Sequence, residues 1–420
     1  MNAKTVVLGR DVRASSEALA NCVAQGLIDQ GCQVLDLGLS GTEEVYFATT
    51  HFGADGGICV TASHNPIDYN GMKMVRADSA PLEAASGLAH IKDLAEANTF
   101  EKSVTLYNIR DVAEEARAAY VERICQFVDI SALKPLTILV NAGQGTAGPT
   151  FDAIAERLAE LGAPLVFERL FHEPDGTFPQ GIPTPLLPEN RPATANAVRA
   201  SCADFGVAWD GDFDRCFFFE HTGAFIDGEY VVGLLAEAFL AKDPSATIIH
   251  DPRIIWNTQD LVAKAGGRAV QTRTGHAFIK KAMRDENAVY GGEMSAHHYF
   301  RDFVYCGSGM IPWLLAAELV SRNGPLAELV AHRKAAFPSS GEINFTLDDT
   351  KAAIARVRAG FEPEAISIDE MDGLGVNMGE WRFNLRSSNT EPVVRLNAEA
   401  RGDAELVEQG VERVKQALLG

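Results

Sequence analysis

The residues around Ser63 form the first group that could do chemistry. An apolar run over 57–62 predicts a strand that leads into this serine, and Asn65-Pro66 predicts a tight turn just after it. A serine held out at the rim of a sheet, beside His64 and shortly before Lys73, could act as a nucleophile or carry a phosphoryl group. The plainer alternative is a strand-to-loop junction with polar side chains and a solvated lysine.

A second group consists of three aspartates at alternate positions, namely Asp210, Asp212 and Asp214. They follow a short predicted strand over 206–209, and Gly211 permits a loop tight enough for the carboxylates to converge on one cation. Hard oxygen ligands favour Mg²⁺. An EF-hand does not fit, because Arg215 stands where that loop needs glycine and His221 where it needs glutamate. A solvated acidic turn and an aspartyl-phosphate hydrolase remain as alternatives.

The glycine-rich stretch over 143–148 supports a competing interpretation. It reads Gly-x-Gly-x-x-Gly and lies between a predicted strand over 136–140 and a predicted helix from about Thr150. Glu168 ends the next strand-like run, about where a ribose-binding acid would stand in a dinucleotide-binding domain. The alternative is a glycine-rich turn that lets strand and helix pack closely, and the motif alone leaves both open.

Two further loops have polar residues suited to binding an anion. Arg386-Ser387-Ser388-Asn389-Thr390 follows a predicted strand over 381–385 and combines a bidentate phosphate ligand with hydroxyls and a turn. A polar hairpin turn is the alternative. Arg273-Thr274-Gly275-His276 opens a predicted helix whose free backbone N–H groups favour an anion, although this signal alone is weak. The neighbours His297 and His298 do not indicate a metal site, because they cannot converge as an i, i+4 pair does.

The composition is ordinary for a globular protein and narrows the partners. With 420 residues the chain exceeds what one hydrophobic core usually supports, which predicts several domains. A net charge of −20 argues against nucleic acid or an anionic membrane as a partner. The seven scattered cysteines form no Cys-x-x-Cys pair, which indicates reduced thiols in the cytoplasm. The chain shows no signal peptide and no apolar run long enough to span a bilayer.

Strand-like and helix-like segments alternate along much of the chain. The expected strands are 4–9, 33–38, 57–62, 136–140, 165–167, 206–209, 246–250 and 268–272, and the expected helices are 15–31, 43–52, 229–241, 258–265 and 325–336. This alternation predicts α/β layers with crossover connections. Residues 337–341 are expected to be a linker. A strand over 393–399 and an amphipathic helix with Val407, Val411, Val414 and Leu418 on one face are expected to follow.

Taken in chain order, the loops at Ser63, 210–215, 291–298 and 386–392 resemble the signature loops of the α-D-phosphohexomutase superfamily. In that family the serine is carried phosphorylated, the aspartate loop binds metal, and the other two loops bind sugar hydroxyls and phosphate. The extension over 299–303 resembles the bacterial phosphomannomutases. These mutases carry a similar glycine-rich turn without binding a dinucleotide, so the resemblance argues against a dinucleotide site.

The resemblance implies a role for each matching residue. The catalytic residues would be Ser63, His64, Lys73, Arg215 and His276. The substrate-binding residues would be Arg253, Glu293, Ser295, His297, Arg386, Ser387, Ser388, Asn389 and Thr390. The Mg²⁺ ligands would be Ser63, through its phosphate, and Asp210, Asp212 and Asp214. Lys73 would assist proton transfer to the serine oxygen.

The same resemblance implies a multi-domain α/β fold. Three similar mixed α/β domains and a smaller C-terminal α+β domain would surround a central active-site cleft. The expected domains are 1–108 with the phosphoserine loop, 109–224 with the metal loop, 225–330 with the sugar-recognition loop, and 331–420 with the phosphate-binding loop.

The implied activity is that of a phosphomannomutase, which interconverts mannose 6-phosphate and mannose 1-phosphate through a phosphoserine enzyme and a hexose 1,6-bisphosphate. A phosphoglucomutase or a dual-specificity phosphohexomutase is the alternative within the class. A dinucleotide-dependent oxidoreductase using 143–148 and a non-catalytic sugar-phosphate binder are the alternatives from other classes. The expected partners are phosphohexoses and their bisphosphate, with neither nucleic acid nor membrane, and the expected assembly is a monomer or weak homo-oligomer.

The N-terminus departs from the family pattern. Family members begin with a segment ahead of the first strand that carries a Tyr-Asp-Ile-Arg-like motif, whose arginine approaches the phosphoserine. This chain starts at Met1 directly in front of that strand, and Asp11-Val12-Arg13 follows the strand and matches a different stretch of the family. We therefore expect the first domain to lack this segment and one phosphate-binding cation, and to expose an edge of its sheet.

Overall fold

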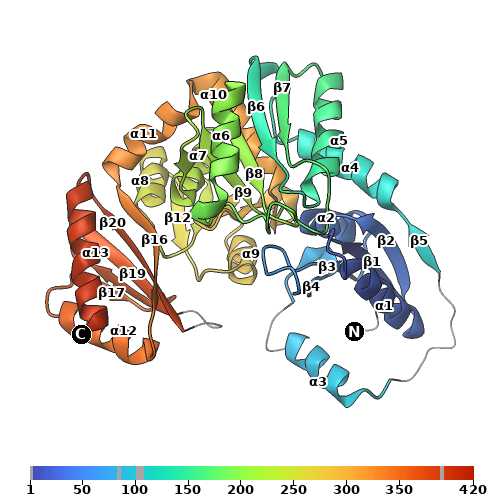
Figure 1. Cartoon of the computed structure of the whole chain (residues 1–420), viewed down its shortest axis with the longest axis horizontal. Helices are drawn as coiled ribbons and strands as arrows, with labels where there is room; N and C mark the ends of the chain where they lie inside the picture. Colours follow the sequence, from blue (N-terminus) through green and yellow to red (C-terminus); the bar gives the residue numbers. More distant parts are fainter. Residues whose placement is uncertain (1–2, 83–86, 101–107, 388–391) are drawn as a thin grey trace. The chain divides into compact units, whose positions relative to one another are not determined.

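A computed structural model describes residues 3–82, 87–100, 108–387 and 392–420. The chain divides into two compact units. The first unit comprises Met1–Phe225 and His297–Leu326, and the second comprises Ile226–Ala296 and Ala327–Gly420. Both units contain strands and helices (Figure 1).

The first sheet of the first unit has the strand order β4-β3-β1-β2-β5. Its strands are β1 (Thr5–Arg10), β2 (Gln33–Leu39), β3 (Gly56–Val60), β4 (Met72–Arg76) and β5 (Ile109–Asp111), and the helices α1 (Ser16–Asp29) and α2 (Thr42–His51) pack on it. Helix α3 (Ala89–Ala97) lies between β4 and β5 in the chain and has no buried residue. All neighbouring strands are parallel except β3 and β4. Val7 of β1 packs with residues of α2, whereas Leu8 packs with residues of α1. Because helices cover both faces, β1 is apolar at consecutive positions.

The second sheet of this unit has the order β10-β9-β8-β6-β7. Its strands are β6 (Leu136–Asn141), β7 (Leu165–Leu170), β8 (Phe205–Trp209), β9 (Cys216–Glu220) and β10 (Phe225–Ile226), and its helices are α5 (Ala147–Glu160) and α6 (Pro192–Ser201). Helix α4 (Ala113–Cys125) packs against α5 and also against α2 and β2 of the first sheet. Strand β6 runs parallel to β7 and β8, and β9 returns antiparallel to β8. The tight return from β8 to β9 contains the three aspartates.

Later segments complete the two units. Residues 297–326 add the antiparallel strands β14 (His298–Phe300) and β15 (Cys306–Gly307) and the buried helix α10 (Met310–Asn323) to the first unit. The second unit contains α7 (Gly228–Leu240), β11 (Thr247–His250), α8 (Trp256–Ala265), β12 (Arg268–Gln271), α9 (His276–Asp285), β13 (Tyr290–Gly292) and α11 (Leu326–Ala336). Strand β11 pairs in parallel with β12 and with β13.

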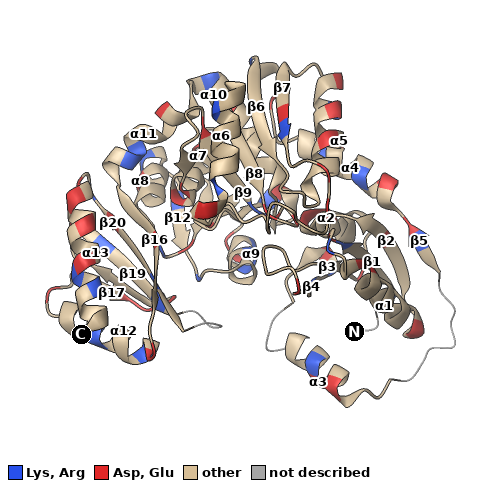
Figure 2. Ribbon diagram, in the orientation of Figure 1, with Lys and Arg blue, Asp and Glu red and all other residues tan. Residues whose placement is uncertain are grey.

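An antiparallel sheet with the order β16-β20-β19-β18-β17 ends the chain. Its strands are β16 (Ser339–Thr346), β17 (Ser367–Asp369), β18 (Leu374–Asn377), β19 (Trp381–Ser387) and β20 (Val393–Ala400), and its helices are α12 (Thr350–Phe361) and α13 (Ala404–Leu419). Both helices pack on this sheet (Figure 1). Figure 2 shows acidic and basic bands along α13, and the opposite face of the helix buries Val407, Val414 and Leu418.

The predicted fold class is confirmed: mixed α/β layers precede a smaller C-terminal α+β region. The predicted strands and helices of the first sheet agree with β1, α1, β2 and α2 to within one or two residues. The prediction of a linker over 337–341 is wrong from Ser339 onwards, because β16 starts there and pairs with β20. Among the described helices, none combines the length and the apolar character needed to cross a membrane.

Two adjacent leucines near the C-terminus test the packing of α13. Leu418 is 1% exposed within the core of the antiparallel sheet, whereas Leu419 is 60% exposed. Leu418→Ala should lower the free energy of unfolding by about 2–5 kcal/mol, because it leaves a cavity. Leu419→Ala should change it by less than about 0.5 kcal/mol. Urea unfolding followed by circular dichroism measures both, and equal effects would contradict the assigned face of the helix.

Candidate active site

Ser63 lies just beyond the carboxyl end of β3 and is 6% exposed. Its backbone φ of 50° lies in the left-handed region, which is unfavourable for a residue with a side chain. The Ser63 N–H donates to Thr61 Oγ1 at 2.9 Å. A strained backbone of this kind persists only where the surrounding contacts determine it.

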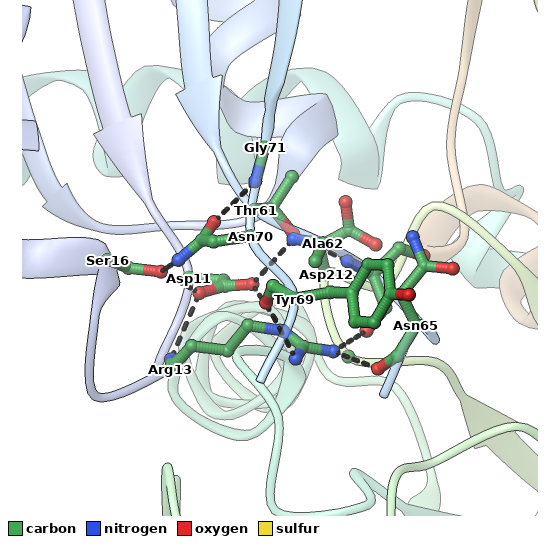
Figure 3. A network of polar contacts seen from close by, with 12 residues as sticks. Asp11, Arg13, Ser16, Thr61, Ala62, Asn65, Tyr69, Asn70, Gly71 and Asp212 are labelled. Atoms are coloured by element: carbon green, nitrogen blue, oxygen red, sulfur yellow. Dashed lines mark hydrogen bonds and ion pairs between the residues drawn. The ribbon is translucent and has the colours of Figure 1, made fainter. Parts of the chain in front are cut away.

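Arg13 supplies most of those contacts (Figure 3). The buried guanidinium donates to four carbonyl oxygens of the serine loop, those of Ser63 (2.9 Å), Asn65 (2.6 Å), Pro66 (2.8 Å) and Tyr69 (3.2 Å). It comes from the segment that follows β1, the strand beside β3. Arg13 therefore fixes the path of the loop that carries Ser63.

Asp11 orients Arg13 and holds the other end of the same loop. Its Oδ1 accepts a hydrogen bond from the backbone N–H of Arg13 at 3.0 Å and another from the Ser16 hydroxyl at 2.5 Å. Its Oδ2 accepts the Ala62 N–H at 3.3 Å and lies 3.5 Å from Arg13 Nε. The buried Asp11–Arg13 pair thus contacts the backbone on both sides of Ser63.

The aspartate loop starts where β8 ends and meets the serine loop directly. Ser63 Oγ donates to Asp210 Oδ2 at 2.6 Å. Asp210, Asp212 and Asp214 are all buried, and each offers an oxygen within 4.8 Å of the oxygens of the other two. The structure brings the three aspartates together beside Ser63, while their role as metal ligands stays a prediction.

Three basic side chains face these carboxylates. Lys73 on β4 donates from Nζ to Asp212 Oδ2 at 2.7 Å and to Asp214 Oδ2 at 2.5 Å. Arg215 Nε lies 3.7 Å from Asp210 Oδ2 and donates to His297 Nε2 at 3.2 Å, while the backbone N–H of Arg215 donates to Asp210 Oδ1 at 3.3 Å. His297 Nε2 is also 3.5 Å from Asp214 Oδ1.

The crowding of charge shifts the acid–base behaviour of the site. Burial, followed by the negative charges of Asp214 and Asp212, raises the pKa of Asp210 to about 7. Burial alone would lower the pKa of Lys73, but Asp212 and Asp214 outweigh it and raise that pKa well above its usual value. His64 Nδ1 is 3.2 Å from Ser63 Oγ. Burial and then Arg215 lower the pKa of His64 to about 3, so its imidazole is neutral at pH 7.

The aspartate residues fit a divalent cation. Asp212 Oδ1 and Asp214 Oδ1 are buried and accept no hydrogen bond within the described residues, although Asp214 Oδ1 has His297 Nε2 3.5 Å away. Such orphaned acceptors are costly unless a cation or a donor reaches them. Carboxylate oxygens are the ligands that hard divalent cations prefer. The triad could therefore bind a metal ion.

The glycine-rich turn over 143–148 supports the aspartate loop. A Cβ on Gly145 would lie 2.6 Å from the carbonyl oxygen of Gly211, and one on Gly148 would lie 2.1 Å from that of His172. The Thr146 N–H donates to the same Gly211 oxygen at 3.1 Å. Close backbone approach explains these glycines without a dinucleotide, and Glu168 is exposed on β7.

The second unit brings together the predicted sugar-binding residues. Arg253 Nη2 donates to Asp251 Oδ2 at 2.7 Å and to Ser295 Oγ at 3.3 Å. Asp251 Oδ2 also accepts the Met294 N–H at 2.9 Å. Glu293 Oε1 accepts the Gly275 N–H at 2.8 Å, which places Glu293 beside the start of α9, where His276 stands.

Arg386 lies at the end of β19 in the same unit. Its Nη1 is 3.3 Å from Asp372 Oδ2, which also accepts the Thr274 N–H at 3.2 Å. Burial, followed by the positive charge of Arg253, lowers the pKa of Arg386. Ser387 is the last residue of β19, and the predicted phosphate ligands Ser388, Asn389 and Thr390 lie outside the described residues.

Comparison with known families accounts for nearly the whole chain. The models of phosphoglucomutase/phosphomannomutase α/β/α domains I, II and III match residues 1–102, 118–223 and 227–337, and the model of the C-terminal domain matches 342–417. The chain belongs to the phosphoglucomutase/phosphomannomutase family. Its members are isomerases that transfer a phosphoryl group, so the predicted enzyme class is confirmed, while the four predicted domain boundaries stay predictions.

Individual relatives of this mutase cover almost its full length. A phosphomannomutase of Salmonella montevideo is 57% identical over 99% of this chain and 91% of its own. A protein of Xanthomonas campestris named "phosphohexose mutases" is 56% identical with the same coverage. The crystal structure of a phosphoglucomutase/phosphomannomutase family protein from Burkholderia thailandensis has a TM-score of 0.84 at 32% identity, and it covers 99% of this chain and 89% of its own.

The mutase site has supporting residues that sequence reasoning missed. Arg13 was set aside as part of a separate family stretch, and Thr42, whose hydroxyl donates to Asp212 Oδ2 at 2.5 Å, was not considered. A polar residue just beyond the carboxyl end of a predicted strand is the only signal that could have indicated Arg13. His297, predicted to bind substrate, lies against Arg215 and Asp214.

Replacing Arg13 by lysine tests whether it shapes the serine loop. An ammonium cannot reach four carbonyl oxygens as the forked guanidinium does. Mutase turnover of Arg13→Lys should fall on the order of 100-fold, because Ser63 is misplaced relative to Asp210. Arg10→Lys is the matched control, since Arg10 is 28% exposed and lies 3.7 Å from Glu17. Turnover of Arg13→Lys equal to that of the control would contradict the role.

Proposed function

We propose that this mutase is a phosphomannomutase, which interconverts mannose 6-phosphate and mannose 1-phosphate with Ser63 as the phosphoryl carrier. The observation behind the proposal is the 2.6 Å contact between Ser63 Oγ and Asp210 Oδ2 at the edge of a buried three-aspartate cluster. The relatives that bear the name phosphomannomutase, at 57% identity, support mannose as the sugar.

The reaction passes the phosphoryl group from the serine to the sugar and back. The P–Oγ bond of phospho-Ser63 breaks as the free hydroxyl of the hexose phosphate forms a new P–O bond, and the proton that this hydroxyl loses is balanced by the proton that Ser63 Oγ gains. The resulting hexose 1,6-bisphosphate reorients within the site, and its other phosphoryl group is then transferred to Ser63. On return the Ser63 hydroxyl loses a proton and the hexose oxygen that gives up its phosphate gains one. Within the described residues, the contacts of Ser63 Oγ that can accept this proton are Asp210 Oδ2 at 2.6 Å and the neutral imidazole of His64 at 3.2 Å.

The metal proposed for the site is Mg²⁺, held by Asp210, Asp212 and Asp214 together with an oxygen of the phosphorylated Ser63. When bound, it neutralises charge on the transferring phosphoryl group. Lys73 and Arg215 supply further positive charge from the protein itself. Phosphoryl transfer depends mainly on such positioning and neutralisation.

The second unit has side chains of its own that could bind a phosphohexose. Arg253 and Arg386 are both positively charged, and the charge of Arg253 lowers the pKa of Arg386. An anion bound between or beside them would offset this repulsion. We assign the phosphate that is not being transferred to Arg386 and Ser387, with Ser388, Asn389 and Thr390. Glu293 and Ser295 are assigned to sugar hydroxyls, and His276 to contacts with the bound hexose phosphate. His297, which belongs to the first unit, is also assigned to contacts with the hexose phosphate.

Replacing the phosphoryl carrier tests the central step. Ser63→Ala should lower mannose 1-phosphate turnover by at least about 1,000-fold, because it removes the oxygen proposed to carry the phosphoryl group. Intact mass spectrometry of the active enzyme should show one phosphate, which the variant lacks. Ser15→Ala, a change at an exposed serine, should keep both the phosphate and the activity.

The result can contradict the proposal in two ways. Retention of near wild-type rates by Ser63→Ala would exclude the phosphoserine mechanism. A coupled assay with mannose 1-phosphate and glucose 1-phosphate, with and without a bisphosphate activator, separates the sugars. A clear preference for glucose would identify a phosphoglucomutase, and similar rates would identify a dual-specificity enzyme.

Removing one carboxylate charge tests the metal. Asp212→Asn should lower turnover on the order of 100-fold or more, because the developing phosphoryl charge is neutralised less well. Chelation should abolish activity and added Mg²⁺ should restore it. Asp68→Asn makes the same charge change at an exposed position of the serine loop and should leave activity near that of the wild type. Full activity in excess chelator would contradict a metal requirement.

A further inference from the structure

Asp212 uses its two carboxylate oxygens differently. Oδ2 accepts hydrogen bonds from Thr42 Oγ1 at 2.5 Å and from Lys73 Nζ at 2.7 Å. Oδ1 is buried and accepts no hydrogen bond within the described residues, and the residue as a whole is 0% exposed. One oxygen is therefore fixed by two donors, while the other remains available to a cation.

Thr42 holds Asp212 through both its backbone and its side chain. It is the first residue of α2 and is 0% exposed. Its N–H donates to the Asp212 carbonyl oxygen at 3.3 Å, while its hydroxyl donates to Oδ2. Two contacts from one rigid helix end restrict rotation of the carboxylate, which a single flexible partner such as Lys73 would not do.

Glu43, the residue after Thr42, connects this end of α2 to the aspartate loop through a second set of hydrogen bonds. The buried carboxylate of Glu43 accepts hydrogen bonds from the hydroxyls of Tyr120 and Ser308 and from the Gly309 N–H. The Gly309 carbonyl oxygen in turn accepts the Trp209 Nε1–H at 2.8 Å. Trp209 directly precedes Asp210, so the first turn of α2 and the start of the aspartate loop share one buried network.

We propose that Thr42 is a positioning residue of the metal site, whose hydroxyl turns Oδ1 of Asp212 towards the bound divalent cation. This inference rests on the proposed function, since it takes the aspartate triad as the metal site. Thr42 is fully buried and contacts Asp212, so it acts through this aspartate. Partners behind a metal ligand fix its orientation, and their loss typically lowers metal affinity about 10–100-fold.

The test compares metal binding by variants of the full chain in the absence of substrate. Thr42→Val removes the hydroxyl and keeps the branched shape, and its Kd for Mn²⁺ should rise about 10–100-fold in a titration followed by electron paramagnetic resonance. Thr42→Ser keeps the hydroxyl and should bind Mn²⁺ nearly as the wild type does. Competition with Mg²⁺ should show the same order of affinities. If Thr42→Val does not fold, Thr42→Ala replaces it with the same expectation.

Thr49→Val is the matched control, because Thr49 is a second fully buried threonine on α2. Its hydroxyl donates at 2.7 Å to the carbonyl oxygen of Val45 on the same helix and contacts no aspartate of the triad. This variant should keep the Mn²⁺ affinity of the wild type. Circular dichroism of each variant, recorded before the titration, checks that the fold is retained.

The outcomes separate this inference from the proposed function. Wild-type Mn²⁺ affinity in Thr42→Val, with weakened binding in Asp212→Asn, would overturn the role of Thr42 and leave the metal site intact. Equal losses in Thr42→Val and Thr49→Val would indicate general loosening of α2 and would also overturn it. No saturable Mn²⁺ binding by the wild-type chain would overturn the metal site itself and this inference with it.

Discussion

The active site depends on keeping three buried carboxylates within 4.8 Å of one another. Each carboxylate loses its hydration, and the three repel one another, so the cluster exists only where cations offset both costs. Lys73, on β4 of the first sheet, provides such a positive charge. Its ammonium donates hydrogen bonds to Asp212 and Asp214 in the loop that follows β8 of the second sheet. The same electrostatic demand that would attract a metal therefore also joins two α/β layers of the first unit and brings the aspartate loop to Ser63.

Regular patterns explain which parts of the fold could be predicted from the sequence. Strand β1 and helices α1 and α2 were predicted almost to the residue, because short apolar runs and periodic helices carry the information locally. Strand β16 was mistaken for a linker, since Pro338 and Gly341 are typical of loops. Its strand character comes from pairing with β20, where the register shifts between Ser339 and Glu342 and Gly341 takes a φ of 62°. The sequence of residues 337–341 alone does not indicate that this segment pairs with β20.

The site divides in the same way. Ser63 and the aspartates could be predicted because a nucleophile or an acidic triplet after a strand is unusual in itself. The roles of Arg13 and Thr42 could not be predicted, because arginine and threonine are common residues. Their roles depend on contacts with residues far away in the sequence. Arg13 reaches carbonyl oxygens 50 to 56 positions away, and Thr42 reaches an aspartate 170 positions away. Only the folded chain shows that these contacts exist.

Both units place a buried ion pair behind a loop that is predicted to bind substrate. In the first unit, Asp11 and Arg13 form hydrogen bonds with the backbone around Ser63. In the second unit, Arg382 and Glu399 form hydrogen bonds with the backbone around Arg253. Arg382 donates to the carbonyl oxygens of Pro252 and Arg253, while Glu399 accepts the N–H groups of Ile255 and Trp256. Buried ion pairs contribute little net stability, because desolvation offsets their attraction, and apolar replacements are often as stable. An apolar side chain, however, could neither donate to those carbonyls nor accept from those N–H groups. The pairs are therefore best understood as devices that fix loop geometry, which is the property that phosphoryl transfer requires most.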